Sequence, residues 1–234
     1  MSLLFYTMIK AVIFDLDNTL LDFMRMKTMA IDAALNGMIE AGLVIKRNTA
    51  RMRIFEIYES KGWEYQEVLD DFIKETAGTL DYKILAGGIV AYKRAKEASL
   101  ILYPNVYSTL IGLSKMGLKL GVVSDAPSRE AWVRICSVNL HHIFDAVVTF
   151  DDTGEHKPSP KPFRLITSLL NINPASSLMI GDWPERDVIG GKKLGMKTAF
   201  ARYGDVFNTR ISGADYDIDN IQEILSIINK ENQL

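Results

Sequence analysis

Two aspartates near the start of the chain, Asp15 and Asp17, follow the apolar residues 12–14. The apolar residues predict a strand that is buried on both faces, as in the middle of a parallel sheet. Side chains alternate along an extended strand, so both carboxylates would point to the same side where the strand ends. Two acids in that position can hold a divalent cation and attack an electrophile. A single Asp-x-Asp is also typical of an ordinary turn, so the choice between these interpretations depends on the rest of the chain.

Further polar side chains lie at the ends of other predicted strands or in the loops that follow them. They are Ser124, Asp125, Lys157, Asp182 and Asp187. If the strands are parallel, these side chains and the two N-terminal aspartates meet at one edge of the sheet. Two unit charges about 4 Å apart repel by roughly 4 kcal/mol at an effective dielectric of about 20, so the acids need a cation. Oxygen ligands favour Mg²⁺ over zinc, and a lysine and a hydroxyl beside the metal are typical of a phosphate site.

The elements that must bring these residues together alternate between strand and helix after residue 98. Strands are predicted at 118–124, 146–150, 177–181, 198–202 and, over a short segment, 216–218. Helices are predicted at 104–117, 127–139, 184–195, 220–230 and, after a polar loop at 151–162, up to residue 171. This alternation predicts right-handed βαβ units, and therefore an α/β fold with a Rossmann-like parallel sheet and helices on both faces. Ligands bind such sheets at the carboxyl ends of the strands.

Residues 22–98 have a different pattern, because only helices are predicted there. Four apolar residues follow helical spacing up to residue 42: Met24, Ile31, Leu35 and Met38. Further helices are predicted at 48–62, with Asn48 as the N-terminal cap, at 64–77 and at 81–98. The sequence therefore predicts an all-helical domain over 22–98, inserted after the first strand of a core domain made of 1–21 and 99–234.

Composition and charge narrow the class of protein. The chain has 234 residues, of which 48% are hydrophobic and 24% charged, as is typical of a globular protein. A net charge of −2 gives no reason to expect nucleic acid or a membrane surface as a partner. With Cys136 as the single cysteine and no sign of a signal peptide, a cytoplasmic location is expected. Met8 is an alternative start to Met1, and the sequence does not indicate an oligomeric state.

Together these segments resemble the phosphatase branch of the haloacid dehalogenase (HAD) superfamily. Four signatures in order carry the resemblance: Asp15-Leu-Asp-Asn-Thr19, the strand-terminal Ser124, Lys157 before a proline, and Gly181-Asp182 with Asp187. The helical insertion resembles the C1-type cap of this family, so the resemblance covers nearly the whole chain. Each signature alone is weak, but four in register are specific. At 8–12, 202–204 and 214–220, outside the expected site, the chain also resembles microbial members described as glyceraldehyde-3-phosphate phosphatases.

The resemblance implies a role for each acid. Asp15 would be the nucleophile that attacks phosphorus and forms an aspartyl-phosphate. Asp17 would protonate the leaving group and then take a proton from the attacking water. Mg²⁺ would be held by Asp15, Asp182 and the backbone carbonyl of Asp17, with Asp187 supporting the metal site. Thr19 would orient the loop.

The resemblance also implies that Ser124, Asp125 and Lys157 bind the substrate. Ser124 and Lys157 would contact the phosphoryl oxygens, and Lys157 would balance the charge of Asp15. Lys161 is an alternative lysine four residues further on. The pattern of the family places the lysine before the first proline, which favours Lys157.

The expected activity is that of a Mg²⁺-dependent phosphatase that acts on a small phosphorylated metabolite, such as glyceraldehyde 3-phosphate, phosphoglycolate or a similar sugar phosphate. A haloacid dehalogenase or a phosphomutase of the same fold is an alternative. Dehalogenation would need neither Mg²⁺ nor a proton donor such as Asp17. A receiver-like signalling domain would use a similar set of residues, but such domains are about half as long and carry the phosphorylated aspartate on the third strand.

Overall fold

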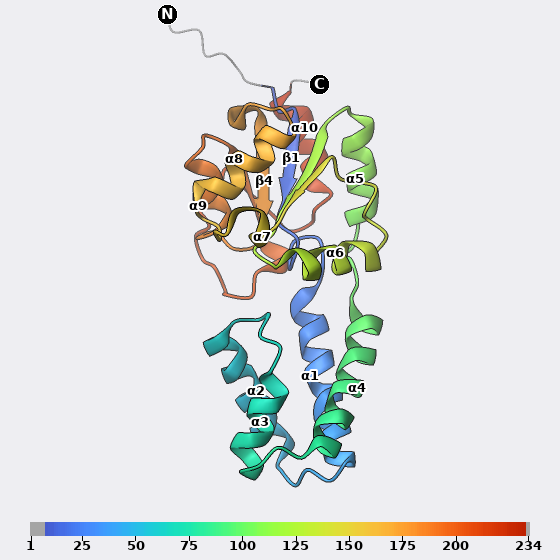
Figure 1. Ribbon diagram of the computed structural model, residues 1–234. Coiled ribbons are helices and arrows are strands. Elements are labelled where there is room, and N and C mark those ends of the chain that lie inside the picture. Colours follow the sequence, from blue (N-terminus) through green and yellow to red (C-terminus); the bar gives the residue numbers. More distant parts are fainter. Residues whose placement is uncertain (1–7, 233–234) are drawn as a thin grey trace, which may run out of the picture. The chain divides into compact units, whose positions relative to one another are not determined.

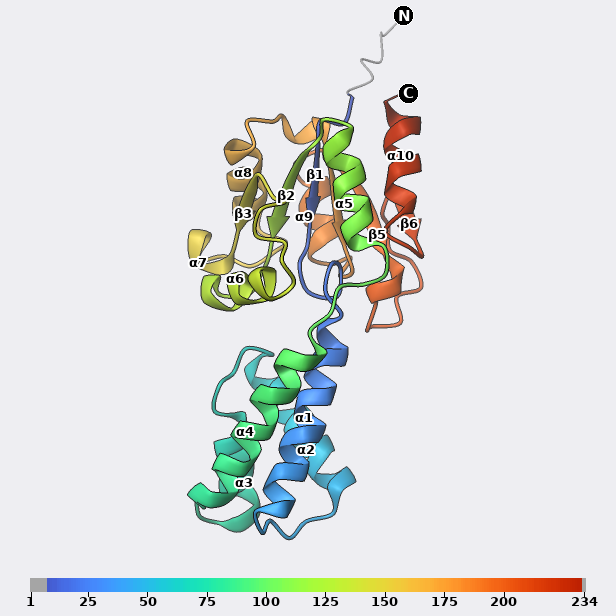
Figure 2. The same ribbon diagram turned by 90° about the vertical axis from the view of Figure 1, so that its right-hand side faces the viewer.

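The computed structural model describes residues 8–232, and residues 1–7, which precede the alternative start at Met8, lie outside the described residues. The chain forms two compact units (Figures 1 and 2). The first, here called the sheet unit, contains the chain up to Asp22 and from Ile101 onward. The second, here called the helical unit, is Phe23–Leu100. Among the described residues, every helix is too short or too polar to cross a membrane.

The two connections to the helical unit run side by side within the sheet unit. Leu21 and Leu102 form an isolated antiparallel bridge. Next to this bridge, the amide of Asp22 donates a hydrogen bond to the carbonyl of Ile101 at 3.1 Å. The segment that leaves the sheet unit is therefore paired, backbone to backbone, with the segment that returns to it.

The sheet unit is built on a six-stranded sheet in which all neighbouring strands are parallel. The strands are β1 (Ala11–Phe14), β2 (Lys119–Val123), β3 (Ala146–Val148), β4 (Ser177–Gly181), β5 (Lys197–Ala201) and β6 (Tyr216–Ile218). Their order in the sheet is β3-β2-β1-β4-β5-β6. The chain runs outward from β1 to one edge and then continues from β4 to the other, so the strand order reverses between β1 and β4. The predicted α/β fold is confirmed.

The register of the three central strands aligns their carboxyl ends. Phe14, the last residue of β1, pairs with Val122 of β2 and with Ile180 of β4. All four residues of β1 are buried, as its uninterrupted apolar sequence predicts. Consequently, the residues that follow β1, β2 and β4 emerge at the same edge of the sheet, at the point where ligands bind in folds of this kind.

Helices cover both faces of this sheet, as Figures 1 and 2 show. One face carries α8 (Pro160–Leu169) and α9 (Asp187–Lys192), and the other carries α5 (Val106–Lys115) and α10 (Glu223–Glu231). Phe163 and Ile166 of α8 pack in a buried cluster with strand residues such as Ile13 and Met179. Since both faces of the sheet are buried, its ends are the places where polar side chains can gather.

Two predicted elements of the sheet unit were wrong in extent. Residue 150 was predicted to end a strand, but β3 ends at Val148 and Phe150–Thr153 form the short helix α7. Thr149 and Asp152 form a capping box, in which the amide of Thr149 donates to Asp152 Oδ2 at 2.7 Å. This local bonding favours a helix start over continued strand pairing. The helix predicted at 184–195 is also shorter, since α9 spans only Asp187–Lys192.

The helical unit consists of four helices around an apolar core. They are α1 (Phe23–Glu40), α2 (Arg47–Lys61), α3 (Val68–Ala77) and α4 (Tyr82–Ser99). The start of α4 is stabilised by Asp81, whose side chain accepts hydrogen bonds from two amides of the first turn. The prediction that Asn48 caps the second helix was wrong, because α2 begins at Arg47 and Asn48 lies inside its first turn.

Candidate active site

The loop that follows β1 is held in one shape by backbone contacts. The amide of Asp15 donates to the carbonyl of Ile180 at 2.8 Å, which continues the pairing of β1 with β4 by one residue. Asn18 then adopts a left-handed conformation with φ of 58°, one that asparagine tolerates better than most residues. The chain thus turns sharply directly after Asp17.

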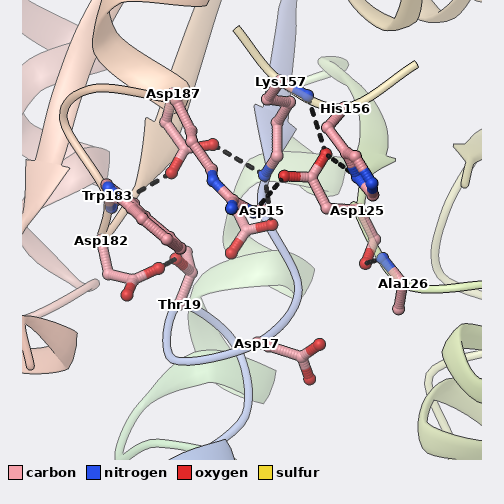
Figure 3. A network of polar contacts seen from close by, with 12 residues as sticks. Asp15, Asp17, Thr19, Asp125, Ala126, His156, Lys157, Asp182, Trp183 and Asp187 are labelled. Atoms are coloured by element: carbon pink, nitrogen blue, oxygen red, sulfur yellow. Dashed lines mark hydrogen bonds and ion pairs between the residues drawn. The ribbon is translucent and has the colours of Figure 1, made fainter. Parts of the chain in front are cut away.

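Three acids from two strand ends form a buried cluster at this edge. Carboxylate oxygens of Asp15, Asp182 and Asp187 all lie within 4.8 Å of one another (Figure 3). Gly181 makes room for this arrangement, because a Cβ atom at this position would lie 2.1 Å from Asp187 Oδ2. The backbone amide of Trp183 donates to the same oxygen at 3.1 Å. The cluster is therefore built by the strand ends and by the turn that leads into α9.

Lys157 supplies the cation of this cluster. Its Nζ atom lies 2.5 Å from Asp15 Oδ1 and 2.7 Å from Asp187 Oδ1, and only 4% of the residue is exposed. The alternative lysine, Lys161, instead donates to the carbonyl of Thr153 at 2.7 Å and is largely exposed. Of the two lysines considered from the sequence, the structure brings Lys157 to the acids.

The electrostatics of the cluster leave it with excess negative charge. Burial raises the pKa of Asp182, and the charges of Asp15 and Asp187 raise it further. Burial likewise raises the pKa of Asp187, although the ammonium of Lys157 opposes this. For Lys157, burial lowers the pKa, but the surrounding carboxylates outweigh this effect and the net shift is upward. Three buried carboxylates with one lysine and only oxygen donors fit a hard divalent cation such as Mg²⁺.

Thr19 and Ser124 contribute hydroxyl groups around the cluster. Thr19 donates from Oγ1 to Asp182 Oδ1 at 3.3 Å and so links the loop after β1 to the acid after β4. Ser124, buried directly after β2, accepts a hydrogen bond from the amide of Ala126 at 3.2 Å. Contact of Ser124 with a phosphoryl group stays a prediction.

Asp125 holds neighbouring loops together. Its Oδ1 atom accepts from the backbone amide of Lys157 at 2.8 Å, and its Oδ2 atom accepts from Arg186 Nη1 at 2.8 Å. The guanidinium of Arg186 also lies over the ring of Trp183, 3.7 Å from its centroid. Substrate binding by Asp125 stays a prediction, and it would have to use the backbone N–H because the carboxylate would repel a phosphate.

Asp17 lies apart from the cluster, and its carboxylate points away from Asp15 and Asp182 (Figure 3). Arg134 Nη1 donates to Asp17 Oδ2 at 2.5 Å. Arg134 belongs to α6 (Ser128–Ser137), and it was missed from the sequence. A signal was present, because the buried face of this helix contains Ala131, Arg134 and Ile135 at helical spacing, so the arginine lies where an apolar residue is expected.

The segment Arg202–Gly204 after β5 also contacts the loop that carries Asp15 and Asp17, although this segment was expected to lie outside the site. The hydroxyl of Tyr203 donates to the carbonyl of Thr19 at 2.8 Å. Gly204 packs so closely on the same loop that a Cβ atom there would lie 1.6 Å from the carbonyl oxygen of Asn18. The loop after β5 is therefore a support for the loop that carries Asp15 and Asp17.

Comparison with known proteins identifies the family. Residues 12–201 match the haloacid dehalogenase-like hydrolases. The glyceraldehyde 3-phosphate phosphatase of Methanocaldococcus jannaschii is 34% identical over 224 residues, which cover 94% of this chain and 97% of that protein.

Two solved structures have the same fold. A HAD phosphatase from Thermococcus onnurineus has a TM-score of 0.68 and 28% identity, covering 94% of this chain and 98% of the other. A HAD hydrolase from Bacillus subtilis bound to magnesium has a TM-score of 0.69 at 18% identity, covering 95% and 99%, and this likeness concerns the fold alone. The chain belongs to the family of haloacid dehalogenase-like hydrolases and is an enzyme of the hydrolase class.

Proposed function

We propose that this enzyme is a Mg²⁺-dependent phosphatase that hydrolyses small phosphate monoesters through an aspartyl-phosphate. The observation that carries this proposal is the buried cluster in which Lys157 bonds to Asp15 while Asp182 and Asp187 lie within 4.8 Å of it. A carboxylate can attack phosphorus as a nucleophile, and an ammonium group bonded to it can also bind the oxygens of a phosphoryl group.

The metal would be held by the carboxylates of Asp15 and Asp182 and by the backbone carbonyl of Asp17. Asp187 already accepts hydrogen bonds from Lys157 and from the amide of Trp183, so its proposed role is to hold Lys157 in position beside the metal site. When bound, Mg²⁺ would neutralise the acids and the phosphoryl oxygens, and so allow one anion to approach another.

The residues of the chain would then carry out the reaction in two steps. In the first step, Asp15 attacks phosphorus and the bond to the leaving oxygen breaks, while Asp17 donates a proton to that oxygen. In the second step, water attacks the aspartyl-phosphate, Asp17 takes a proton from the water, and the bond between Asp15 and phosphorus breaks. Lys157 and Ser124 would bind the phosphoryl oxygens throughout.

For the substrate we propose glyceraldehyde 3-phosphate first, because the relative from M. jannaschii carries that name and matches almost the whole chain. Phosphoglycolate and other sugar phosphates are the comparison substrates. We propose that the helical unit acts as the cap, which excludes water and selects small substrates. The single cysteine fits a reducing compartment, so we place the enzyme in the cytoplasm.

The proposal is tested by phosphate release from a panel of phosphorylated metabolites, measured after EDTA treatment and again after Mg²⁺ is added. We expect continuous turnover with Mg²⁺ and none after chelation. Activity that ignores the chelator, or halide release from 2-haloacids, would favour a dehalogenase. A single phosphorylation of the protein without turnover would favour a signalling domain. Transfer of the phosphoryl group to a sugar instead of water would favour a phosphomutase.

A further inference from the structure

Arg134 is a buried charged side chain that the proposed reaction does not use. Only 1% of the residue is exposed, and it bonds from Nη1 to Asp17 Oδ2 at 2.5 Å. Removing a guanidinium group from water costs several kcal/mol unless an opposite charge and hydrogen bonds compensate. Asp17 supplies such a charge, and its own side chain is still 21% exposed. The pair therefore joins a buried, fixed cation to a carboxylate at the edge of the site.

The helix that carries Arg134 is anchored to the sheet unit. At its first residue, the amide of Ser128 donates to Asp151 Oδ2 at 2.8 Å, and the hydroxyls of Ser128 and Thr149 bond at 2.6 Å. Ala131 and Ile135, on the same side of α6 as Arg134, are fully buried. Arg134 thus extends to the loop after β1 from an element that cannot shift easily.

The position of Asp17 suits a proton donor. In the displacement at phosphorus, the leaving oxygen lies on the side opposite the nucleophile, Asp15. A carboxylate bonded into the cluster around Lys157 would lie on the wrong side of the phosphoryl group. Asp17 instead lies outside this cluster (Figure 3). Its Oδ2 atom accepts a hydrogen bond from Arg134.

We propose that Arg134 is a positioning residue that holds Asp17 for proton transfer, an inference that rests on the proposed function. The guanidinium holds the carboxylate through Oδ2, and the carboxylate passes its proton to the leaving oxygen as the bond from that oxygen to phosphorus breaks. In the second step the same carboxylate receives a proton from water as the bond from water to phosphorus forms. Without Arg134, the carboxylate can rotate away from this line.

The test compares two phosphate esters that differ in their need for a proton. Glyceraldehyde 3-phosphate releases an alkoxide that must be protonated, whereas 2,4-dinitrophenyl phosphate releases a phenoxide that is stable without a proton. The variants are Arg134→Gln, Arg134→Lys and, as the matched control on the same helix, Arg129→Gln, where the arginine is exposed. The measurement is the ratio of kcat/KM for the two esters, which reports the step in which the leaving group departs and excludes the hydrolysis step that both esters share. This ratio does not depend on how much of each variant is folded.

General acid catalysis contributes typically 10²–10⁴-fold, so we expect Arg134→Gln to lower this ratio about 10- to 100-fold. Arg134→Lys should recover part of the loss, and Arg129→Gln should leave the ratio unchanged. In an Asp17→Asn background, Arg134→Gln should lower the ratio no further. Equal losses on both esters would show that Arg134 is merely structural and would overturn the inference. No phosphate release from either ester by the unmodified enzyme would instead contradict the proposed function.

Discussion

The cluster of acids and lysine in the sheet unit differs from the ion pairs of the helical unit in its exposure to solvent. In the sheet unit, Asp15, Lys157 and Asp187 form ion pairs with almost no exposure to solvent. In the helical unit, the ion pairs given by the structure lie at the surface, as in the contact of Arg53 with Glu75 at 2.7 Å, where nearly half of each side chain is exposed. Its core is formed by apolar side chains such as Phe72, and Lys27 is a buried charged residue whose Nζ donates to the hydroxyl of Tyr92 at 3.2 Å.

The proposed reaction uses the buried ion pairs of the sheet unit and none of the exposed ion pairs of the helical unit. Burying a charge is costly, and a buried ion pair is seldom more stable than an apolar replacement of the same size. Exposed pairs contribute little because water and salt screen them. Substitutions of the buried charges should therefore change activity or stability sharply, and substitutions of the exposed charges should change neither.

The largest effect is expected for Asp15→Asn. An amide cannot attack phosphorus to form an aspartyl-phosphate, so we expect phosphate release to fall by about 10³-fold or more. Thermal unfolding should show that the variant is folded. The matched control is Asp32→Asn in the helical unit, where the aspartate pairs with Arg51 at the surface, and its activity should equal that of the unmodified enzyme. Substantial turnover by Asp15→Asn would exclude this residue as the nucleophile.

A loss of stability is expected for Lys157→Met. The substitution leaves the carboxylates of Asp15 and Asp187 buried without their cation, and breaking a buried pair costs about 3–5 kcal/mol. We expect Mg²⁺ to restore part of this loss, because the metal neutralises the same carboxylates. Thermal or denaturant unfolding with and without Mg²⁺ measures both effects. Lys161→Met, at an exposed lysine of the same unit, is the control, and an equal loss of stability there would contradict the distinction between buried and exposed charges.

A smaller effect is expected from pH. Burial and neighbouring charges raise the pKa of Asp182 and of Asp187. Between the ordinary pKa of an aspartate, about 3.9, and these raised values, the two acids hold more protons in the metal-free folded protein than in the unfolded chain. Their contribution to stability must therefore fall as pH rises through this window.

The proposed Mg²⁺ would bind the deprotonated acids and remove this penalty, so the increase in Tm on adding Mg²⁺ should be greater at pH 8 than at pH 5. Unfolding curves at the two pH values, with and without Mg²⁺, measure the difference. Asp182→Asn should abolish most of the increase. A greater increase at pH 5 would contradict the electrostatic description of the cluster.

The smallest effect is expected for Arg53→Gln in the helical unit. Its partners Glu56 and Glu75 are as exposed as the arginine itself, so we expect no resolvable change in Tm and none in phosphate release. Measurements at low and high salt sharpen this prediction, because any small contribution should vanish with screening. A clear loss of stability at high salt would mean that this exposed pair is stronger than its setting suggests.

The parts of this structure that follow local patterns could be predicted from sequence. The apolar segment before Asp15 and the segment before Asp182 predicted β1 and β4, since uninterrupted apolar runs suit the centre of a parallel sheet. Because parallel strands align their carboxyl ends, the meeting of Asp15, Lys157 and Asp182 followed from the strand prediction.

The contacts that could not be predicted join residues far apart in the chain. Arg134 looks like an ordinary helix residue until the fold places it against Asp17, 117 residues away. The same is true of Tyr203, which bonds to Thr19 across 184 residues. The predicted start of α2 was wrong for a different reason. Asn48 is a good capping residue, but α2 begins one residue earlier, at Arg47, and the residue that precedes it is Lys46.

The antiparallel bridge between Leu21 and Leu102 has a consequence for how the protein can be altered. It brings the two ends of the 78-residue helical unit, Phe23–Leu100, close together in space. An inserted domain whose two ends lie next to each other can be replaced by one of different length without distorting the domain that carries it. If the helical unit is the cap as proposed, grafting helices from a relative at these two points should change substrate choice and leave Asp15 and Lys157 in place.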